Sequence, residues 1–133
     1  MSSSSDGAIP EATEKIATSV IDAGFQVHAA LGPGLLESAY EHCLAYELQQ
    51  RSISVQRQLS LPVLYRGIQI EAGYRIDLLA GDAVVVEIKA IEAYLPIHLA
   101  QLMTYLRLSG CRVGFLMNFN VRLFKSGVKR VVL

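Results

Sequence analysis

The sequence predicts an α/β fold, with a central mixed β-sheet of four to five strands flanked by helices. Three observations favour this class. Apolar residues recur at helical spacing over residues 11–31 and 35–51, they alternate at period two from residue 53 onward, and they form a β-branched run over residues 83–90. Two helices followed by alternating segments and a continuous apolar strand indicate a sheet with helices packed on its faces.

The first two helices are predicted from their apolar stripes. Over residues 11–31 the stripe falls at spacings of three and four, and Gly32-Pro33-Gly34 ends the helix. Over residues 35–51 a second stripe leaves Glu37, Glu41 and Glu47 outside it. We expect both helices to pack on the sheet through these stripes.

Three strands are predicted next. Alternating apolar residues indicate one strand over residues 53–65, which ends at the turn Arg66-Gly67. A second strand is expected over residues 68–79 and a third, central strand over residues 83–90. Gly81-Asp82 between the last two is a hairpin signal, so these two strands should pair antiparallel.

The C-terminal part predicts one more helix and further strands. Residues 95–109 form a helix long enough for a right-handed crossover to a parallel strand over residues 112–119. Ser126-Gly127 is expected to separate two short strands, over residues 121–124 and 128–132. The predicted order is therefore α-α-β-β-β-α-β-β.

Composition indicates one globular domain. The 133 residues suffice for a hydrophobic core, and 52% apolar with 18% charged residues excludes disorder over most of the length. No apolar run approaches the roughly 18 residues of a membrane span. We expect a disordered lead-in over residues 1–10 and one domain over residues 11–133, with surplus apolar surface used in a homodimer.

Charge and cysteine content bear on partners and compartment. Residues 1–50 hold seven acidic residues and one basic residue, whereas residues 51–133 hold five acidic and eleven basic residues. This split fits either a phosphate-binding basic face or ordinary solvated charge. Cys43 and Cys111 have neither metal-ligand spacing nor a disulfide framework, which predicts a reducing, cytoplasmic location.

Asp77, Glu87 and Lys89 form a candidate catalytic cluster. Glu87 and Lys89 are two residues apart on one predicted strand, so their side chains share a face. Asp77 and Glu87 lie five positions on either side of Asp82, so the hairpin brings them together. Two carboxylates suit Mg²⁺ or Mn²⁺, and a lysine beside them can position water at a phosphate.

The same spacing also fits a surface ion pair between Glu87 and Lys89, with Asp77 as a separate surface acid. The neighbouring residues favour the first interpretation. Val84, Val85 and Val86 make this segment unsuited to an exposed edge strand. Buried charges cost on the order of several kcal/mol unless they are paired or bind a metal ion.

These residues carry a family resemblance. Asp77 followed by Glu87-Ile88-Lys89 resembles the D…(D/E)xK signature of the PD-(D/E)xK nuclease superfamily, although Ile76 replaces the proline of that name. The segment Gln101-Leu-Met-Thr-Tyr105 is similar to the QxxxY motif of exonuclease-like branches of the superfamily. The resemblance implies a restriction-endonuclease-like core.

Two further segments point to one branch. Gly34-Leu-Leu-Glu37-Ser-Ala-Tyr40 resembles the motif that names the GxxExxY family, a small group within the superfamily. The late segment over residues 115–130 is similar to the C-terminal end of that family, so the resemblance covers about residues 14–133.

The resemblance implies roles for the site residues. Asp77, Glu87, the Ile88 carbonyl and Glu37 would hold Mg²⁺ or Mn²⁺, and Lys89 would position water. Gln101 would orient Lys89 or a phosphate, while Tyr105 would stack or form a hydrogen bond nearby. Without the resemblance, Glu37 is explained by the helix dipole, and Gln101 and Tyr105 by the polar edge of an amphipathic helix.

Three basic residues are candidate substrate contacts. Arg75 flanks Asp77 and lies on the opposite face from Ile76, where it would form a salt bridge or contact a phosphate. Lys129 and Arg130 belong to the predicted C-terminal hairpin, where they would either guide a nucleic-acid backbone or protect a sheet edge.

The favoured interpretation is a divalent-metal-dependent nuclease that hydrolyses phosphodiester bonds of nucleic acid, with DNA favoured over RNA. The chain length holds a catalytic core, so sequence-specific cutting would need a dimer or a separate specificity partner. Two alternatives stay open, a non-catalytic nucleic-acid-binding or regulatory module of the same fold and a homo-oligomeric scaffold.

Overall fold

The computed structural model describes residues 7–133, and the part of the predicted lead-in over residues 1–6 lies outside the described residues. Within that range the chain forms three α-helices, a mixed five-stranded sheet and a separate two-stranded hairpin, so the predicted α/β class is confirmed. The helices are α1 (Glu11–Leu31), α2 (Glu37–Gln50) and α3 (Pro96–Ser109). None of these helices combines the length and hydropathy needed to cross a membrane in the described part of the chain.

The five-stranded sheet has the order β1-β4-β5-β6-β7. Its strands are β1 (Val55–Ser60), β4 (Arg75–Ala80), β5 (Val84–Lys89), β6 (Val113–Asn118) and β7 (Val128–Val132). The β5 and β6 strands run parallel and are joined through α3, whereas the other neighbours pair antiparallel. The predicted crossover helix therefore connects two parallel strands.

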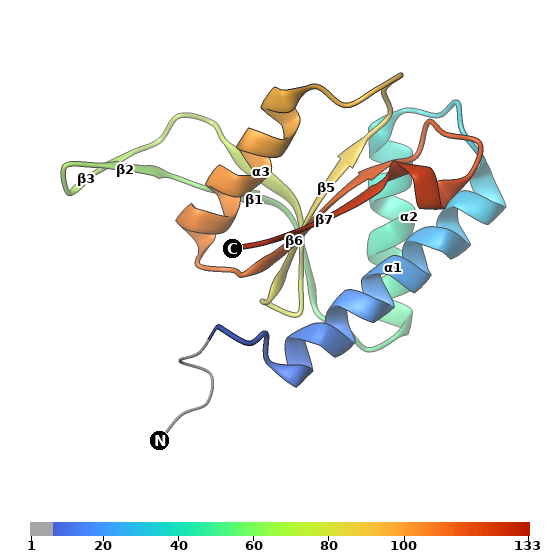
Figure 1. Ribbon diagram of the computed structural model, residues 1–133, viewed down its shortest axis with the longest axis horizontal. Helices are drawn as coiled ribbons and strands as arrows, with labels where there is room; N and C mark the ends of the chain where they lie inside the picture. Colours follow the sequence, from blue (N-terminus) through green and yellow to red (C-terminus); the bar gives the residue numbers. More distant parts are fainter. Residues whose placement is uncertain (1–6) are drawn as a thin grey trace.

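Helices cover both faces of the sheet (Figure 1). The α1 and α2 helices pack on one face, where Val84, Val86 and Ile88 of β5 point into a core with Phe115 of β6. On the other face, Leu102 and Leu106 of α3 pack over Val85 and Leu116. The continuous apolar run of β5 is thus explained, because this strand is buried on both faces.

Two of the predicted long strands are each broken in the structure. The segment over residues 53–65 divides into β1 and β2 (Val63–Tyr65), because Pro62 between them has no N–H for the ladder. The segment over residues 68–79 divides into β3 (Ile68–Ile70) and β4, where Gly73 adopts a left-handed φ of 80°.

The β2 and β3 strands pair with each other and form a hairpin that projects from the sheet beyond α3 (Figure 1). Apolar side chains on it are exposed to solvent. They are Leu64, Tyr65, Ile68 and Ile70.

The predicted C-terminal hairpin is wrong. In place of a strand over residues 121–124 the chain forms bends and a 3₁₀ helix, η2 (Phe124–Gly127), and only β7 follows. Phe124 is buried, and its ring lies 5.0 Å from that of Phe25 on α1. Gly127 passes against the backbone of Asn118 too closely for any side chain. These contacts hold the segment away from strand geometry.

Candidate active site

Asp77 and Glu87 lie opposite each other where β4 and β5 separate. The paired register ends at Leu78 and Val86. One step further, the Asp77 N–H donates to Glu87 Oε2 at 2.9 Å, and the Ile88 N–H donates to Asp77 Oδ2 at 2.8 Å. Each carboxylate therefore accepts a backbone hydrogen bond from the other strand, in place of the ladder. The structure brings these two residues together as the hairpin spacing predicts.

Glu87 and Lys89 extend on the α3 face of the sheet. Val85 belongs to the core under α3, and side chains alternate along a strand, so Glu87 and Lys89 follow on the same side. Glu87 is only 5% exposed, whereas Lys89 is partly buried. The predicted shared face of the carboxylate and the ammonium is therefore found.

Burial controls the charge of Glu87. The pKa of Glu87 is raised from 4.5 to about 8, first by loss of hydration and then by the negative charges of Asp77 and Glu41, while the hydrogen bond from the Asp77 N–H and the charge of Lys89 oppose the rise. A carboxyl group with this pKa is largely protonated at neutral pH when no cation is near. Cation binding at the site would favour its ionised form.

Glu41 and Gln58 extend this acidic pair toward α2. The Gln58 side-chain N–H₂ donates to Glu41 Oε1 at 2.7 Å and lies 3.3 Å from Asp77 Oδ1. Glu41 is buried and forms an ion pair with Arg57 at 3.0 Å, between its Oε2 and the Arg57 Nη2. Helix α2 is thus tied to β1 and to the acidic pair by one carboxylate.

Glu37, the predicted third acid, lies at the end of β5. Its Oε2 accepts a hydrogen bond from the Ala90 N–H at 3.2 Å, and its side chain is exposed. No hydrogen bond links Glu37 to Asp77 or Glu87 within the described residues. Glu37 therefore lies at the rim of the site, next to the residue that follows Lys89.

Gln101 and Tyr105 line a groove between α3 and the base of the β2–β3 hairpin. Tyr105 is buried, and this burial raises its pKa, with further contributions from the negative charges of Glu87 and Asp77. Tyr105 therefore lies near the acidic pair. Gln101 forms no hydrogen bond with Lys89 among residues 7–133, so the predicted orienting contact is not formed directly.

The three basic candidates occupy different places. Arg75 is exposed at the start of β4 and lies opposite in orientation to the buried Ile76, as predicted. Lys129 lies on β7 with its Nζ 5.7 Å from the centroid of the Tyr94 ring. Arg130 forms an ion pair with Glu14 of α1 at 2.9 Å.

Lys129 and Arg130 therefore do not act as one basic cluster. Adjacent residues on a strand extend from opposite faces of the sheet. Arg130 contacts Glu14 on α1, whereas Lys129 contacts Tyr94, which lies next to α3. The predicted hairpin that would have carried both residues is absent from the described part of the chain.

The donor set fits a divalent cation only in part. Among residues 7–133 no group of three or more His, Cys, Asp or Glu side chains is arranged to hold a metal ion. One oxygen of each of Asp77, Glu87 and Glu37 is directed at a backbone N–H. Asp77 and Glu87 each keep a second oxygen without a main-chain partner, and two such oxygens are the hard donors that Mg²⁺ and Mn²⁺ prefer.

Sequence reasoning missed three residues that the structure brings to this region. Glu41 is one helical turn after Glu37, so their shared helix face was a usable signal. Arg57, next to Gln58, interrupts the apolar alternation of this strand, and the φ of 53° at Gln58 lies at the same break. Asn118 is buried at the end of β6 and its side-chain amide binds the N–H and the C=O of Ile91, which fixes the loop after Lys89.

Comparison with known proteins places this arrangement in a family. A family model described as the PD-(D/E)XK nuclease superfamily matches residues 14–131. No curated protein and no solved structure gives a significant match. The helices and the mixed five-stranded sheet agree with the restriction-endonuclease-like α/β fold of this superfamily, whose members generally hydrolyse phosphodiester bonds. The chain belongs to the PD-(D/E)XK nuclease superfamily.

Proposed function

We propose that this protein hydrolyses phosphodiester bonds of nucleic acid with the help of Mg²⁺ or Mn²⁺. The observation that carries the proposal is the reciprocal hydrogen bonding of Asp77 and Glu87 where β4 and β5 separate, with Lys89 on the same face. Membership of the superfamily supports it. A divalent cation, when bound by the two carboxylates, would neutralise charge that develops on the phosphate.

The chain's own residues would perform distinct parts of the reaction. Lys89 would hold the attacking water through its ammonium group and stabilise charge on a phosphate oxygen. The water oxygen bonds to phosphorus, the ester P–O bond breaks, the water loses a proton to solvent and the leaving alkoxide gains one. Asp77 and Glu87 are fixed for this task by the backbone N–H groups that they accept from.

The remaining predicted roles belong to the same proposal. Glu37 at the rim and the Ile88 carbonyl would complete the cation's ligands, with water molecules at other positions. Gln101 would orient a phosphate from the groove wall. The motif over residues 34–40 supports assignment to the GxxExxY branch.

Exposed basic residues would contact the substrate backbone. Arg75 lies two residues before Asp77 and is exposed, so it supports contact with a phosphate next to the acidic pair. Lys129 is exposed on the same sheet face as Glu87, since Glu87 pairs with Leu116 and Leu116 pairs with Lys129. Arg130 would contribute less, because Glu14 already neutralises its charge.

A non-catalytic module of the same fold is the second candidate. The observation that favours it is that Asp77 and Glu87 already satisfy backbone N–H groups of separated strands, a structural role that needs no cation. Under this alternative Asp77 and Glu87 would stabilise the place where β4 and β5 separate, and nucleic acid would bind without being cut.

A degradation assay separates the two candidates. Wild-type protein, Asp77→Asn and Lys89→Ala are incubated with DNA and RNA in Mg²⁺, Mn²⁺ or EDTA, and products are resolved on denaturing gels. Asp82→Asn and Lys125→Ala serve as matched controls, because both residues are exposed and lie away from Asp77 and Glu87. Cleavage that needs the cation and is lost only in Asp77→Asn and Lys89→Ala supports the nuclease. Binding without cleavage in every arm supports the second candidate.

We also propose that the protein forms a homodimer. The support is the number of large apolar side chains exposed in the described residues, among them Leu36 at 79% and Leu123 at 56%. Light scattering at high micromolar concentration should give the dimer mass, and a monomer mass would overturn this part of the proposal.

A further inference from the structure

A groove lies beside the acidic pair, between α3 and the base of the β2–β3 hairpin. It encloses about 300 Å³, at the lower end of the volumes of ligand-binding pockets. Its wall combines apolar, aromatic and polar side chains from three separate segments. The lining residues are Val63, Tyr74, Ile97, Ala100, Gln101, Thr104, Tyr105 and Leu108.

The groove adjoins the site through Tyr105. This residue lines the groove and packs in one buried cluster with Ile76, which precedes Asp77 on β4, and with Leu116, which lies opposite Glu87 in the register of β5 and β6. The ring of Tyr74 lies 6.5 Å from that of Tyr105, centroid to centroid. A ligand in the groove would therefore lie next to the position where a phosphate meets the acidic pair.

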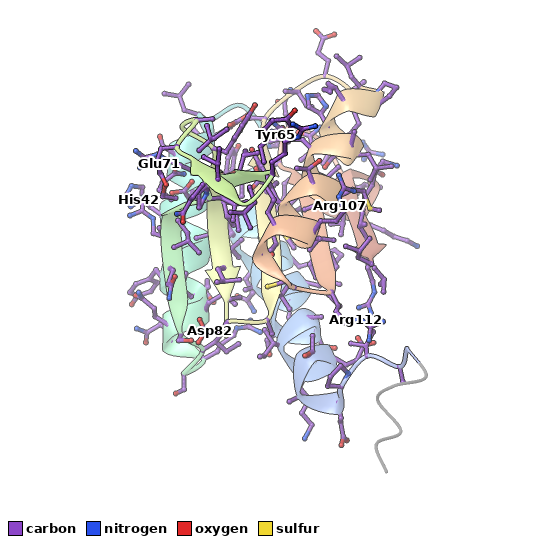
Figure 2. All side chains as sticks on the ribbon, turned by 90° about the vertical axis from the view of Figure 1, so that its left-hand side faces the viewer. His42, Tyr65, Glu71, Asp82, Arg107 and Arg112 are labelled. Atoms are coloured by element: carbon purple, nitrogen blue, oxygen red, sulfur yellow. The ribbon has the colours of Figure 1, made fainter. Side chains whose placement is uncertain are left out.

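The groove presents a flat aromatic surface and polar groups together. Tyr74 is 44% exposed, so one side of its ring is open to a ligand. Thr104 Oγ1 accepts a hydrogen bond from Arg107 Nη2 at 3.0 Å, which brings a guanidinium group to the groove wall. Figure 2 shows Arg107 on α3.

We infer that this groove binds an unstacked nucleobase of a single-stranded nucleic acid and thereby places the neighbouring phosphodiester at Asp77 and Glu87. The inference rests on the proposed function and names its substrate class. Tyr74 offers a stacking face, and the amide of Gln101 can donate to or accept from a base edge. Arg107, which donates a hydrogen bond to Thr104 of the groove wall, supplies positive charge for a flanking phosphate.

The chemistry of the groove selects against a regular duplex. A base inside a duplex is stacked on both faces, so it cannot reach the ring of Tyr74 unless it leaves the helix. The guanidinium of Arg107 suits a phosphate backbone better than it suits an apolar surface of a second copy, since burying it in an apolar dimer interface would cost solvation. A single strand is therefore the occupant that matches both the aromatic and the basic groups.

Fluorescence anisotropy tests the inference with defined probes. The full chain in EDTA is titrated with labelled oligothymidylate, oligouridylate, a DNA duplex and an abasic strand of equal length. Tyr74→Ala removes the stacking ring, and Ala100→Leu fills the groove from an exposed helix position. Tyr46→Ala is the matched control, because Tyr46 is a 59% exposed tyrosine on α2 and lies outside the groove. Circular dichroism confirms folding of each variant.

The expected result is tighter binding of the base-bearing strands than of the abasic strand, by at least about fivefold, the lower end of the effect of one stacking aromatic. Tyr74→Ala and Ala100→Leu should abolish this difference, and Tyr46→Ala should keep it. The tighter binding of either oligothymidylate or oligouridylate indicates whether the preferred substrate is DNA or RNA. Equal binding of the abasic strand, or an unchanged difference in both groove variants, would overturn the inference.

Two combined outcomes keep this inference separate from the proposed function. If cleavage is lost in Asp77→Asn but strand binding depends neither on bases nor on Tyr74, the proposed nuclease function is supported and nucleobase binding in the groove is overturned. If binding depends on bases and on Tyr74 but no cleavage occurs in Mg²⁺ or Mn²⁺, nucleobase binding in the groove is supported and the proposed nuclease function is contradicted. A dimer that Ala100→Leu dissociates while strand binding stays unchanged assigns the groove to a second copy and overturns the inference.

Discussion

The side-chain amide of Gln58 lies 2.7 Å from Oε1 of Glu41 and donates a hydrogen bond to it, which joins β1 to α2. Gln58 holds this position with a left-handed backbone, at a φ of 53°, between Arg57 and Leu59, which both pair with β4. A non-glycine residue in this region costs on the order of 1–2 kcal/mol. The fold therefore accepts local strain in order to place one neutral donor between two carboxylates.

Substitution of Gln58 separates the strain from the hydrogen bonds. Gln58→Ala and Gln58→Gly both lose the side-chain amide, but only glycine relieves the left-handed backbone. We expect Gln58→Gly to unfold with a free energy roughly 0.5–1 kcal/mol higher than Gln58→Ala in urea titrations. The neighbouring exposed Gln56 lacks a positive φ, so there the glycine variant should be the less stable one. If the glycine variant were less stable than the alanine variant at position 58 as well as at position 56, the backbone of Gln58 would carry no strain.

Stability should depend on pH through Glu87. Its pKa is about 8 in the folded protein against 4.5 for an unperturbed group, so the unfolded state releases this proton first as pH rises. The contribution of the protonated carboxyl to stability is complete below pH 4.5 and is lost as pH rises toward 8, by an amount on the order of a few kcal/mol.

Glu87→Gln tests this dependence in the absence of divalent cations. The variant cannot ionise, so its free energy of unfolding should decline less than that of the wild type between these pH values. Glu71→Gln, at an exposed position on the projecting segment, should keep the wild-type profile (Figure 2). Parallel profiles for wild type and Glu87→Gln would mean that Glu87 titrates as an ordinary surface acid.

Metal ions should stabilise the folded protein if the acidic pair binds them. A ligand that binds only the folded state at one hundred times its Kd adds about 2.7 kcal/mol to the free energy of unfolding. Asp77→Asn should lose the Mn²⁺-dependent rise in Tm, whereas Lys89→Ala should keep it because both carboxylates remain. Asp82→Asn controls for the loss of one acidic charge. Equal Mn²⁺ shifts in wild type and Asp77→Asn would exclude this pair as the metal site.

The central part of the site follows from local sequence patterns. The β-branched run of β5 predicts a buried strand, and Gly81-Asp82 predicts the hairpin that brings Asp77 to Glu87. Both signals depend on residues close together in the chain. The alternation of Glu87 and Lys89 with apolar neighbours then follows from the period of a strand.

The parts that were not predicted depend on contacts between distant segments. The sequence pattern predicts that Glu41 is a solvent-exposed acidic residue of a helix. It is buried in the structure because Arg57 and Gln58 of β1 pack against it. The 3₁₀ turn over Phe124–Gly127 depends on aromatic packing with α1 and on the close approach of Gly127 to β6. A single sequence does not state which distant residues will meet, so local pattern alone favoured a hairpin there.

Asn118 should be important for stability through the loop that follows Lys89. It is 2% exposed, its Nδ2 donates to the Ile91 carbonyl at 2.8 Å, and its Oδ1 accepts from the Ile91 N–H at 3.1 Å. Asn118→Ala leaves these groups without partners, at a cost of about 2–3 kcal/mol in chemical denaturation. Asn120→Ala removes only a 3.5 Å contact of the side-chain amide with the same carbonyl and should cost less than about 1 kcal/mol. Similar losses in both variants would contradict the bridging role of Asn118.

Salt dependence of nucleic-acid binding should identify which basic residues contact phosphates. Each phosphate contact contributes about one unit to the slope of log K against log salt concentration. Arg75→Ala and Lys129→Ala should each reduce the slope by about one, since both side chains are exposed and carry no ion pair among the described residues. Arg130→Ala is the matched control on β7, because its guanidinium is already paired with Glu14, and it should leave the slope unchanged. The measurement is anisotropy of a labelled strand over a series of salt concentrations in EDTA. A slope that falls in Arg130→Ala and stays constant in Arg75→Ala would place the nucleic acid on the α1 side of the sheet, away from Asp77 and Glu87.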